Sequence, residues 1–270
     1  MIRFILNDQL IEANLPGGSS LLDYIRYRAD LPGTKIGCRE GDCGACTVLE
    51  GRLQDNQLVY HSIVSCLTPL GNAEGRHIVT VEGIWTGKPN PVQQAFVDHG
   101  GTQCGFCTPG FVMSLHGHAM QAAASNPESA IASVSGNICR CTGYKSIERS
   151  AAAISRQLRE KNPDNPLEWL VGHGWLPEYF RQIPGRLREI QIPGHKHQNP
   201  QPGNKEASFD GDNGNRKMPW LIAGGTDLMV QRSEELEKLS PVRLAELPGT
   251  KSILFDESDV WIGAGVVAAE

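Results

Sequence analysis

The chain has 270 residues, of which 40% are hydrophobic and 20% are charged, as is ordinary for a globular protein. Its formal net charge of −5 does not favour binding to nucleic acid or to an anionic membrane. Its apolar runs are shorter than a membrane span of roughly 20 residues, and its first residues resemble no export signal. We therefore expect a cytoplasmic protein with more than one domain and no membrane partner.

Residues 1–84 are predicted to form a small sheet with one helix. Ile2, Phe4 and Leu6 alternate as in a half-buried strand, and Asn7-Asp8 predicts a hairpin turn. The other predicted elements are a strand at 10–15, a helix that is capped by Ser19 or Ser20 and ends at Pro32-Gly33, a glycine-rich loop at 37–44, and strands at 47–49 and 78–81.

Residues 85–163 are predicted to be helical. Asn90-Pro91 and Thr108-Pro109 are both typical of helix starts. A further helix is expected from about Ser146, because apolar residues recur there at helical spacing. These residues are Ile147, Ala151, Ile154 and Leu158.

Residues 164–218 are interpreted as a connector and a linker. The first part contains Trp169 and Trp175, and such residues usually pack against neighbouring domains. From Gly194 to Lys217 the composition is polar, which predicts a flexible linker. Residues 219–270 are typical of the start of an α/β unit.

The eight cysteines of the chain form two compact sets of four. The first set is Cys38, Cys43, Cys46 and Cys66, and the second is Cys104, Cys107, Cys139 and Cys141. The first set has the C-x4-C-x2-C spacing of plant-type [2Fe–2S] sites, with a distant fourth cysteine. The pairs of the second set precede two predicted helices, whose N-termini stabilise thiolate charge. Structural zinc is an alternative at both sets, most of all at the second.

Three motifs resemble the iron–sulfur part of the xanthine dehydrogenase family of molybdenum hydroxylases, namely CREGDCGACTV, QCGFCTPG and GNICRCTGY. The resemblance covers residues 1 to about 160. It implies an α+β multidomain protein with a ferredoxin-like β-grasp [2Fe–2S] domain, then a four-helix [2Fe–2S]-binding domain. A partial α/β FAD-binding domain of the PCMH type would follow.

The resemblance also implies roles for particular residues. Gln103 would contact the molybdopterin of a partner chain, and Cys141 would lie near the same pterin. The FAD diphosphate would be held by a strand–turn–helix, since glycines allow close approach to phosphate. Its residues are Leu221, Ile222, Ala223, Gly224, Gly225, Thr226, Asp227 and Leu228. No catalytic residue is expected in this chain.

The family's flavin domain is longer than the segment after residue 218, and its second FAD motif is missing here. We therefore expect an incomplete FAD site that binds FAD weakly or not at all, unless another chain carries the remainder. An α/β piece of about 50 residues is also only marginally stable on its own, because so short a chain buries a small hydrophobic core.

The function implied is that of an oxidoreductase subunit in purine catabolism. It would relay electrons from a large molybdenum-cofactor subunit through two [2Fe–2S] clusters toward FAD and NAD or another acceptor. Three alternatives remain open: the small subunit of an aldehyde oxidase or carbon monoxide dehydrogenase, a stand-alone ferredoxin-like carrier, and a structural zinc protein.

Overall fold

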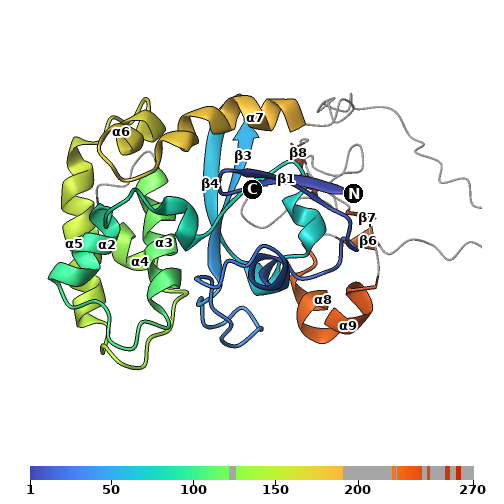
Figure 1. Cartoon of the computed structure of the whole chain (residues 1–270), viewed down its shortest axis with the longest axis horizontal. Helices are drawn as coiled ribbons and strands as arrows, with labels where there is room; N and C mark the ends of the chain where they lie inside the picture. Colours follow the sequence, from blue (N-terminus) through green and yellow to red (C-terminus); the bar gives the residue numbers. More distant parts are fainter. Residues whose placement is uncertain are drawn as a thin grey trace, which may run out of the picture.

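A computed structural model of the chain describes residues 1–121, 126–190, 221–222, 224–238, 242–243, 253–255 and 260–262. The predicted linker at 194–217 and residue Ala223 lie outside the described residues. The described part is built from a mixed sheet, a group of helices, a helical connector and a small third segment (Figure 1).

The first part is a five-stranded sheet with the order β2-β1-β5-β3-β4. Its strands are β1 (Ile2–Leu6), β2 (Gln9–Ala13), β3 (Thr47–Gln54), β4 (Gln57–Val64) and β5 (His77–Val79). β1 and β5 run parallel and the other neighbours run antiparallel. The predicted hairpin turn is confirmed at Asn7, whose φ is 54°. Residues Leu21 and Ile25 cover this sheet and are fully buried with Phe4 and Val48.

Two details of this part differ from the sequence prediction. The helix that begins at Leu21 is an α-turn, α1 (Leu21–Asp23), followed by a π-helix, η1 (Tyr24–Arg28). The strand β4 was missed, because its residues do not alternate regularly between buried and exposed. Short 3-10 turns η2 (Ser65–Leu67), η3 (Leu70–Ala73) and η4 (Val81–Ile84) complete the part.

The second part contains four helices, α2 (Pro91–Asp98), α3 (Thr108–Met120), α4 (Pro127–Ala132) and α5 (Lys145–Gln157), the last extended by η5 (Leu158–Glu160). The start of α2 is confirmed, since Asn90 and Gln93 form a reciprocal capping box. The apolar face predicted for α5 is buried. The short helix α4 was not anticipated.

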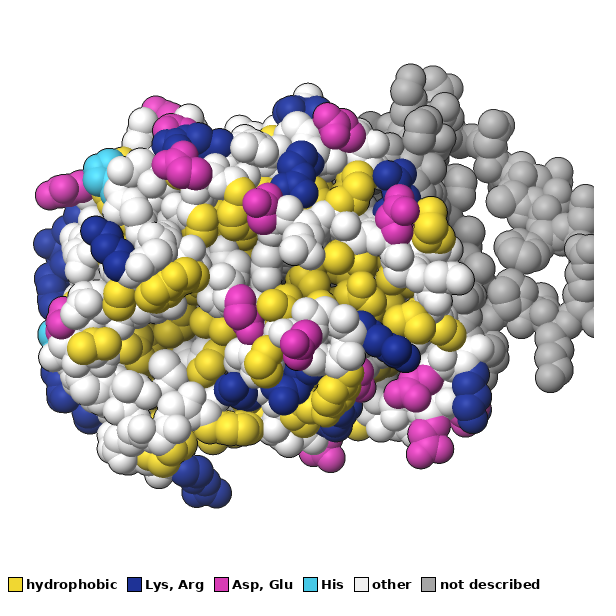
Figure 2. All heavy atoms as spheres, in the orientation of Figure 1, with side chains coloured by type: hydrophobic (Ala, Val, Ile, Leu, Met, Phe, Trp, Pro, Cys, Tyr) yellow, Lys and Arg dark blue, Asp and Glu magenta, His cyan; other side chains and the backbone are white. Residues whose placement is uncertain are grey.

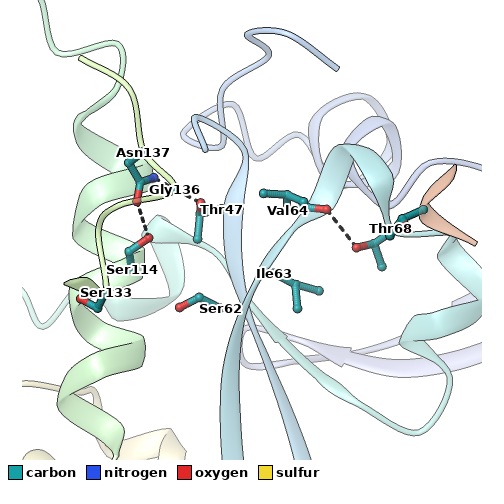
Figure 3. Close-up of a pocket in the computed structure, with 10 residues that line it drawn as sticks. Thr47, Ser62, Ile63, Val64, Thr68, Ser114, Ser133, Gly136 and Asn137 are labelled. Carbon is teal, nitrogen blue, oxygen red and sulfur yellow. Dashed lines mark hydrogen bonds between the residues drawn. The ribbon is translucent and has the colours of Figure 1, made fainter. Parts of the chain in front are cut away.

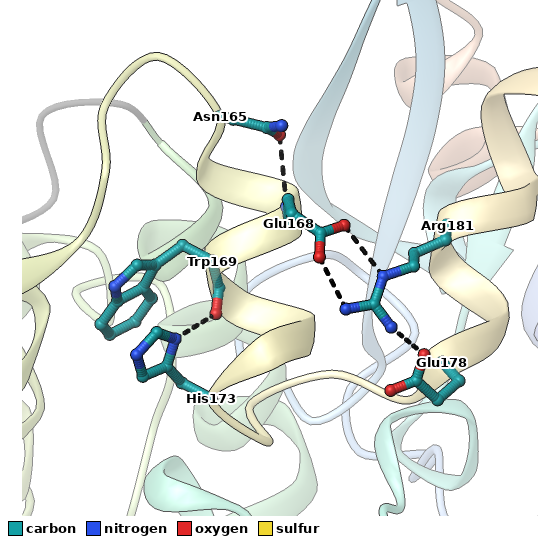
Figure 4. Close-up of polar contacts among 6 residues, drawn as sticks. All are labelled: Asn165, Glu168, Trp169, His173, Glu178 and Arg181. Atoms are coloured by element: carbon teal, nitrogen blue, oxygen red, sulfur yellow. Dashed lines mark hydrogen bonds and ion pairs between the residues drawn. The ribbon is translucent and has the colours of Figure 1, made fainter.

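The connector is helical and ties the two parts together. It comprises α6 (Pro166–Gly172), η6 (Glu178–Gln182) and α7 (Ile183–Ile190). Arg181 forms a two-pronged ion pair with Glu168, at 2.9 and 2.7 Å, and also pairs with Glu178 (Figure 4). Leu170 is buried with the helical part, whereas Leu187 is buried against Ile5 of the sheet.

The third segment is described in short pieces. They are β6 (Leu221–Ile222), α8 (Thr226–Gln231), α9 (Ser233–Leu236), β7 (Val242–Arg243), β8 (Ile253–Phe255) and β9 (Val260–Ile262). β6 pairs with β7 in parallel and β8 pairs with β9 antiparallel. This is the mixed α/β character that the sequence predicted for the segment.

The face drawn in Figure 2 mixes acidic and basic side chains with hydrophobic ones, so no single charge dominates it. Among the described residues, no helix is both long and apolar enough to cross a membrane.

Candidate metal centres

The first cysteine loop folds its backbone around its own sulfur atoms. The amide of Cys38 donates to the Sγ of Cys43 at 3.4 Å, and the amide of Glu40 donates to the Sγ of Cys38 at 3.3 Å. Burial acts to raise the pKa of Cys38, but hydrogen bonds from the backbone amides of Glu40, Cys43 and Asp42 and from the Cys43 side chain lower it below its usual value. The loop therefore stabilises thiolate, the form that binds metal, at Cys38, whereas burial raises the pKa of Cys43.

The loop needs glycine where its backbone turns back on itself. Gly44 has a φ of 64°, in the left-handed region, and a Cβ there would overlap the carbonyl oxygen of Gly136. The prediction of a glycine-dependent loop is thus explained at this position by both conformation and space.

The fourth cysteine of this set comes from η2 and meets Cys46. A hydrogen bond between the two side chains lowers the pKa of Cys46 to about 6 and raises the pKa of Cys66, which donates the proton. Both side chains are buried, at 2% and 5% exposure. The structure therefore brings the distant Cys66 into contact with Cys46 of the loop.

The second set is also brought together. The sulfur atoms of Cys104 and Cys141 lie 3.6 Å apart. Burial raises the pKa of Cys107 to about 12, and a hydrogen bond with Cys139 acts in the same direction. Burial also acts to raise the pKa of Cys139, but hydrogen bonds from Thr142 lower it, with the hydroxyl at 3.1 Å from the sulfur.

These cysteines lie before helix starts, as predicted. Cys107 is the N-cap of α3, and Cys139 and Cys141 lie in the loop that leads to α5. Tyr144, the N-cap of α5, adopts a left-handed φ of 67° and accepts a hydrogen bond from the Cys139 amide at 3.0 Å. Sequence reasoning did not single out Thr142 or Tyr144, although both lie in the quoted GNICRCTGY motif.

The donor set fits a two-metal cluster. Each set offers four thiols, and their sulfur contacts are made in pairs: Cys46 with Cys66 in the first set, and Cys104 with Cys141 in the second. A tetrahedral metal with sulfur ligands at about 2.3 Å keeps them about 3.8 Å apart, close to the 3.6 Å spacing of the second pair. Within the described part of the chain, no three His, Cys, Asp or Glu side chains converge on a single metal position. Four thiolates are the donor set that a [2Fe–2S] cluster requires.

The two sets are connected by the backbone. The amide of Ile138, next to Cys139, donates to the carbonyl of Cys43 at 3.0 Å. Asn137 is buried beside it, donating to the Gly44 carbonyl at 2.9 Å and accepting from the Ser114 hydroxyl at 2.7 Å. Sequence reasoning missed Asn137, because an asparagine in a loop carries no signal of a partner 93 positions away.

A cavity of about 390 Å³ lies beside this link (Figure 3). Hydroxyl side chains from β4, α3 and the 133–137 loop line it, and Thr226 of α8 reaches it. No cysteine lines this cavity, so it is separate from the two thiol sets.

Gln103 is exposed and lies directly before the exposed Cys104. Three large hydrophobic side chains close in sequence to the second set are also exposed. They are Phe106, between Cys104 and Cys107, at 48%, and Ile138 and Tyr144, on either side of Cys139 and Cys141, at 47% and 39%. The second set therefore opens to a surface with an apolar rim.

The segment predicted to bind FAD forms a strand, a turn and a helix, as expected locally. β6 ends at Ile222, Gly225 has a left-handed φ of 81°, and α8 follows from Thr226. This left-handed conformation explains why the second residue of the Gly224-Gly225 pair is a glycine.

Family models match the two parts of the chain separately. The description "2Fe-2S iron-sulfur cluster binding domain" matches residues 4–70, and "[2Fe-2S] binding domain" matches residues 80–152. The matched ranges contain all eight cysteines. Xanthine dehydrogenase of Blastobotrys adeninivorans is 45% identical over 140 residues, or 50% of this chain and 10% of that protein. The chain belongs to the xanthine dehydrogenase family of molybdenum hydroxylases.

Two solved structures extend this comparison. Quinoline 2-oxidoreductase from Pseudomonas putida 86 is 36% identical, with 58% of this chain and 94% of that chain covered and a TM-score of 0.47. Aldehyde oxidoreductase from Desulfovibrio gigas is 27% identical, with 72% of this chain and 22% of that chain covered and a TM-score of 0.51. The chain spans about a tenth of the length of its curated xanthine dehydrogenase relative. Its matched part is the iron–sulfur region of the family.

Proposed function

We propose that this chain is the electron-transfer part of a molybdenum hydroxylase of the xanthine dehydrogenase type. The observation that carries the proposal is the gathering of eight cysteines into two sets within the two matched domains. Each set would hold one [2Fe–2S] cluster, which supplies one-electron redox chemistry when it is bound. The domains proposed are residues 1–84, 85–163, 164–218 and 219–270.

The ligands proposed for the first cluster are Cys38, Cys43, Cys46 and Cys66, and those for the second are Cys104, Cys107, Cys139 and Cys141. The proposal is supported by what the neighbouring residues do. The Glu40 amide and the Thr142 hydroxyl donate to cysteine sulfur atoms, which favours thiolate over thiol. Hydrogen bonds of this kind also tune the potential of a cluster.

The same chain keeps the two sets at a fixed separation. The bond from Ile138 to Cys43 connects a residue adjacent to one set with a member of the other. Buried hydrogen bonds of Asn137 hold the two loops in this register. Electron transfer between two sites depends on a constant short path, and these residues provide the rigid contact.

The partner we propose is a chain that carries the molybdenum cofactor, docking at the exposed second set. The exposure of Phe106, Ile138 and Tyr144 around Cys104 and Cys141 supports this surface. Gln103, at the same surface, is proposed to contact the pterin of that partner. The substrate we propose is a purine or a similar heterocycle, by analogy with the 45% identical relative. A cytoplasmic location completes the proposal.

Residues 221–228 are proposed as part of a FAD site, with NAD or another acceptor beyond it. Support comes from the strand–turn–helix and the left-handed Gly225, which allow close approach of a phosphate.

Anaerobic reconstitution tests the proposed function. We expect about four irons and four acid-labile sulfides per chain, and two distinct paramagnetic signals after dithionite reduction. Cys46→Ser and Cys104→Ser should each remove one of the two signals, whereas Ser135→Ala, at an exposed position, should remove neither.

Zinc bound without iron or sulfide would instead show a structural zinc protein.

Purification from the native host tests the partner. Recovery of a molybdenum-containing chain is expected, and its repeated absence would favour a stand-alone carrier.

A further inference from the structure

The inner pair of the first cysteine set is covered by the third segment of the chain. Cys46 and Cys66 share one apolar cluster with Met229 of α8 and Leu236 of α9. Met229 is 5% exposed and Leu236 is fully buried. Residues more than 160 positions away in the sequence thus close the site.

Close backbone contacts keep this cover in place. α8 packs against η2, which carries Cys66. The backbone of Leu236 approaches Gly18 so closely that a Cβ at Gly18 would overlap its carbonyl oxygen. The Asn72 side chain also donates to the Gly224 carbonyl at 3.3 Å. Figure 1 shows α8 and α9, in orange, beside the sheet part and away from the helical part.

An apolar cover has a definite effect on a redox centre. A [2Fe–2S] cluster carries one more negative charge when it is reduced, and that charge is stabilised by water and disfavoured by apolar surroundings. Removing water therefore lowers the reduction potential and also hinders the entry of iron chelators.

We propose that α8 and α9 form an apolar cap that excludes water from Cys46 and Cys66, the inner pair of the first cysteine set. Met229 is the side chain of this cap that lowers the reduction potential of the cluster. The inference rests on the proposed function, since it requires a cluster at this set. It assigns to the third segment a role that does not depend on flavin.

The second set provides an internal reference. Cys104 and Cys141 are exposed, whereas Met229 of α8 and Leu236 of α9 are buried at the first set. A change in the cap should therefore alter the reduction potential and the iron release of the first cluster and leave those of the second cluster unchanged.

Substitution at two adjacent positions of α8 tests the cap in the full-length chain. Met229→Ser opens the buried face, and Val230→Ser, at a position that is 47% exposed, is the matched control. For Met229→Ser we expect a more positive potential of the first cluster in a redox titration followed by paramagnetic resonance. Iron release from that cluster to a chelator should be about tenfold faster.

Val230→Ser and the second cluster should show neither change, and Met229→Leu, which keeps the apolar volume, should behave as the unaltered chain. The Cys104→Ser variant, which lacks the second cluster, shows which paramagnetic signal belongs to which cluster. If Met229→Ser and Val230→Ser have equal potentials and equal iron-release rates, the proposal of an apolar cap is wrong, while the proposal of two clusters still holds. An unaltered chain without iron would overturn the proposed function and the cap together.

Discussion

At the scale of single residues, the contact between the two cysteine loops depends on Asn137. Its side chain is 5% exposed and satisfies the Gly44 carbonyl and the Ser114 hydroxyl at once. Removing it takes the acceptor from the buried Ser114 hydroxyl, a loss that costs about 1–3 kcal/mol. The Gly44 carbonyl loses one donor but still accepts from Thr47.

We expect Asn137→Ala to lower the free energy of unfolding by about 1–3 kcal/mol, measured by chemical denaturation. The magnetic interaction between the two reduced clusters should weaken in the same variant, because the loops lose their fixed register. Asn162→Ala is the control, since Asn162 is exposed and only caps a local turn. An unchanged spin interaction in Asn137→Ala would show that Asn137 stabilises the fold without positioning the sites.

The cysteine sets could be predicted from the sequence because ligand spacing is a local property of the chain. C-x4-C-x2-C and the C-x2-C pair are visible within a few positions. Asn137 and Met229 could not be predicted, because their importance comes from partners far away in the sequence, such as Gly44 and Cys66. A loop asparagine and a helical methionine are each ordinary until those partners are known.

At the scale of elements, the connector is joined to the sheet through an aromatic contact centred on His77. The His77 ring lies 5.4 Å from Phe180 and 6.0 Å from Tyr179, both of η6. One ring nitrogen faces the Tyr60 hydroxyl at 2.6 Å, and the other faces the Asn7 carbonyl at 2.9 Å. Burial lowers the pKa of His77 to about 3, so the ring is neutral in the folded chain.

This contact predicts a loss of stability in acid. The unfolded chain takes up the His77 proton near pH 6.5 and the folded chain only near pH 3, so stability present above pH 6.5 falls progressively below it. By pH 4.5 the loss attributable to His77 is on the order of 2–3 kcal/mol, measured as unfolding free energy against pH. His77→Gln should flatten this dependence, whereas His173→Gln, on the exposed side of α6, should not. Parallel curves for His77→Gln and the unaltered chain would contradict the assignment.

Elements with local start signals were predictable, and those defined by tertiary contacts were not. The helix α2 was predicted because Asn90 and Pro91, two adjacent residues, are typical of a helix start. β4 was missed since its partner β3 decides its extent, and α4 was missed because six residues carry too little periodicity. The π-helix at Tyr24–Arg28 likewise has no sequence signature.

At the scale of the whole molecule, the two cysteine sets differ in their access to solvent. The first has Cys46 and Cys66 buried beneath α8 and α9, and the second has Cys104 and Cys141 at the surface. We expect an iron chelator to bleach the reconstituted chain in two phases, with the fast phase belonging to the second set.

The Cys104→Ser variant, which lacks the second cluster, should show only the slow phase. Addition of a molybdenum-containing partner that docks at the second set should slow the fast phase and leave the slow phase unchanged. A single phase in the unaltered chain would contradict the difference in access.

The bond between Ile138 and Cys43 also has a consequence for how the protein is made. The loop that holds three of the first four thiols is held in its folded shape by contacts with the segment before Cys139. During synthesis, that segment leaves the ribosome about 95 residues later than Cys43. We therefore expect iron loading of the first set to be a late event of biogenesis, completed after both halves have docked rather than one half at a time.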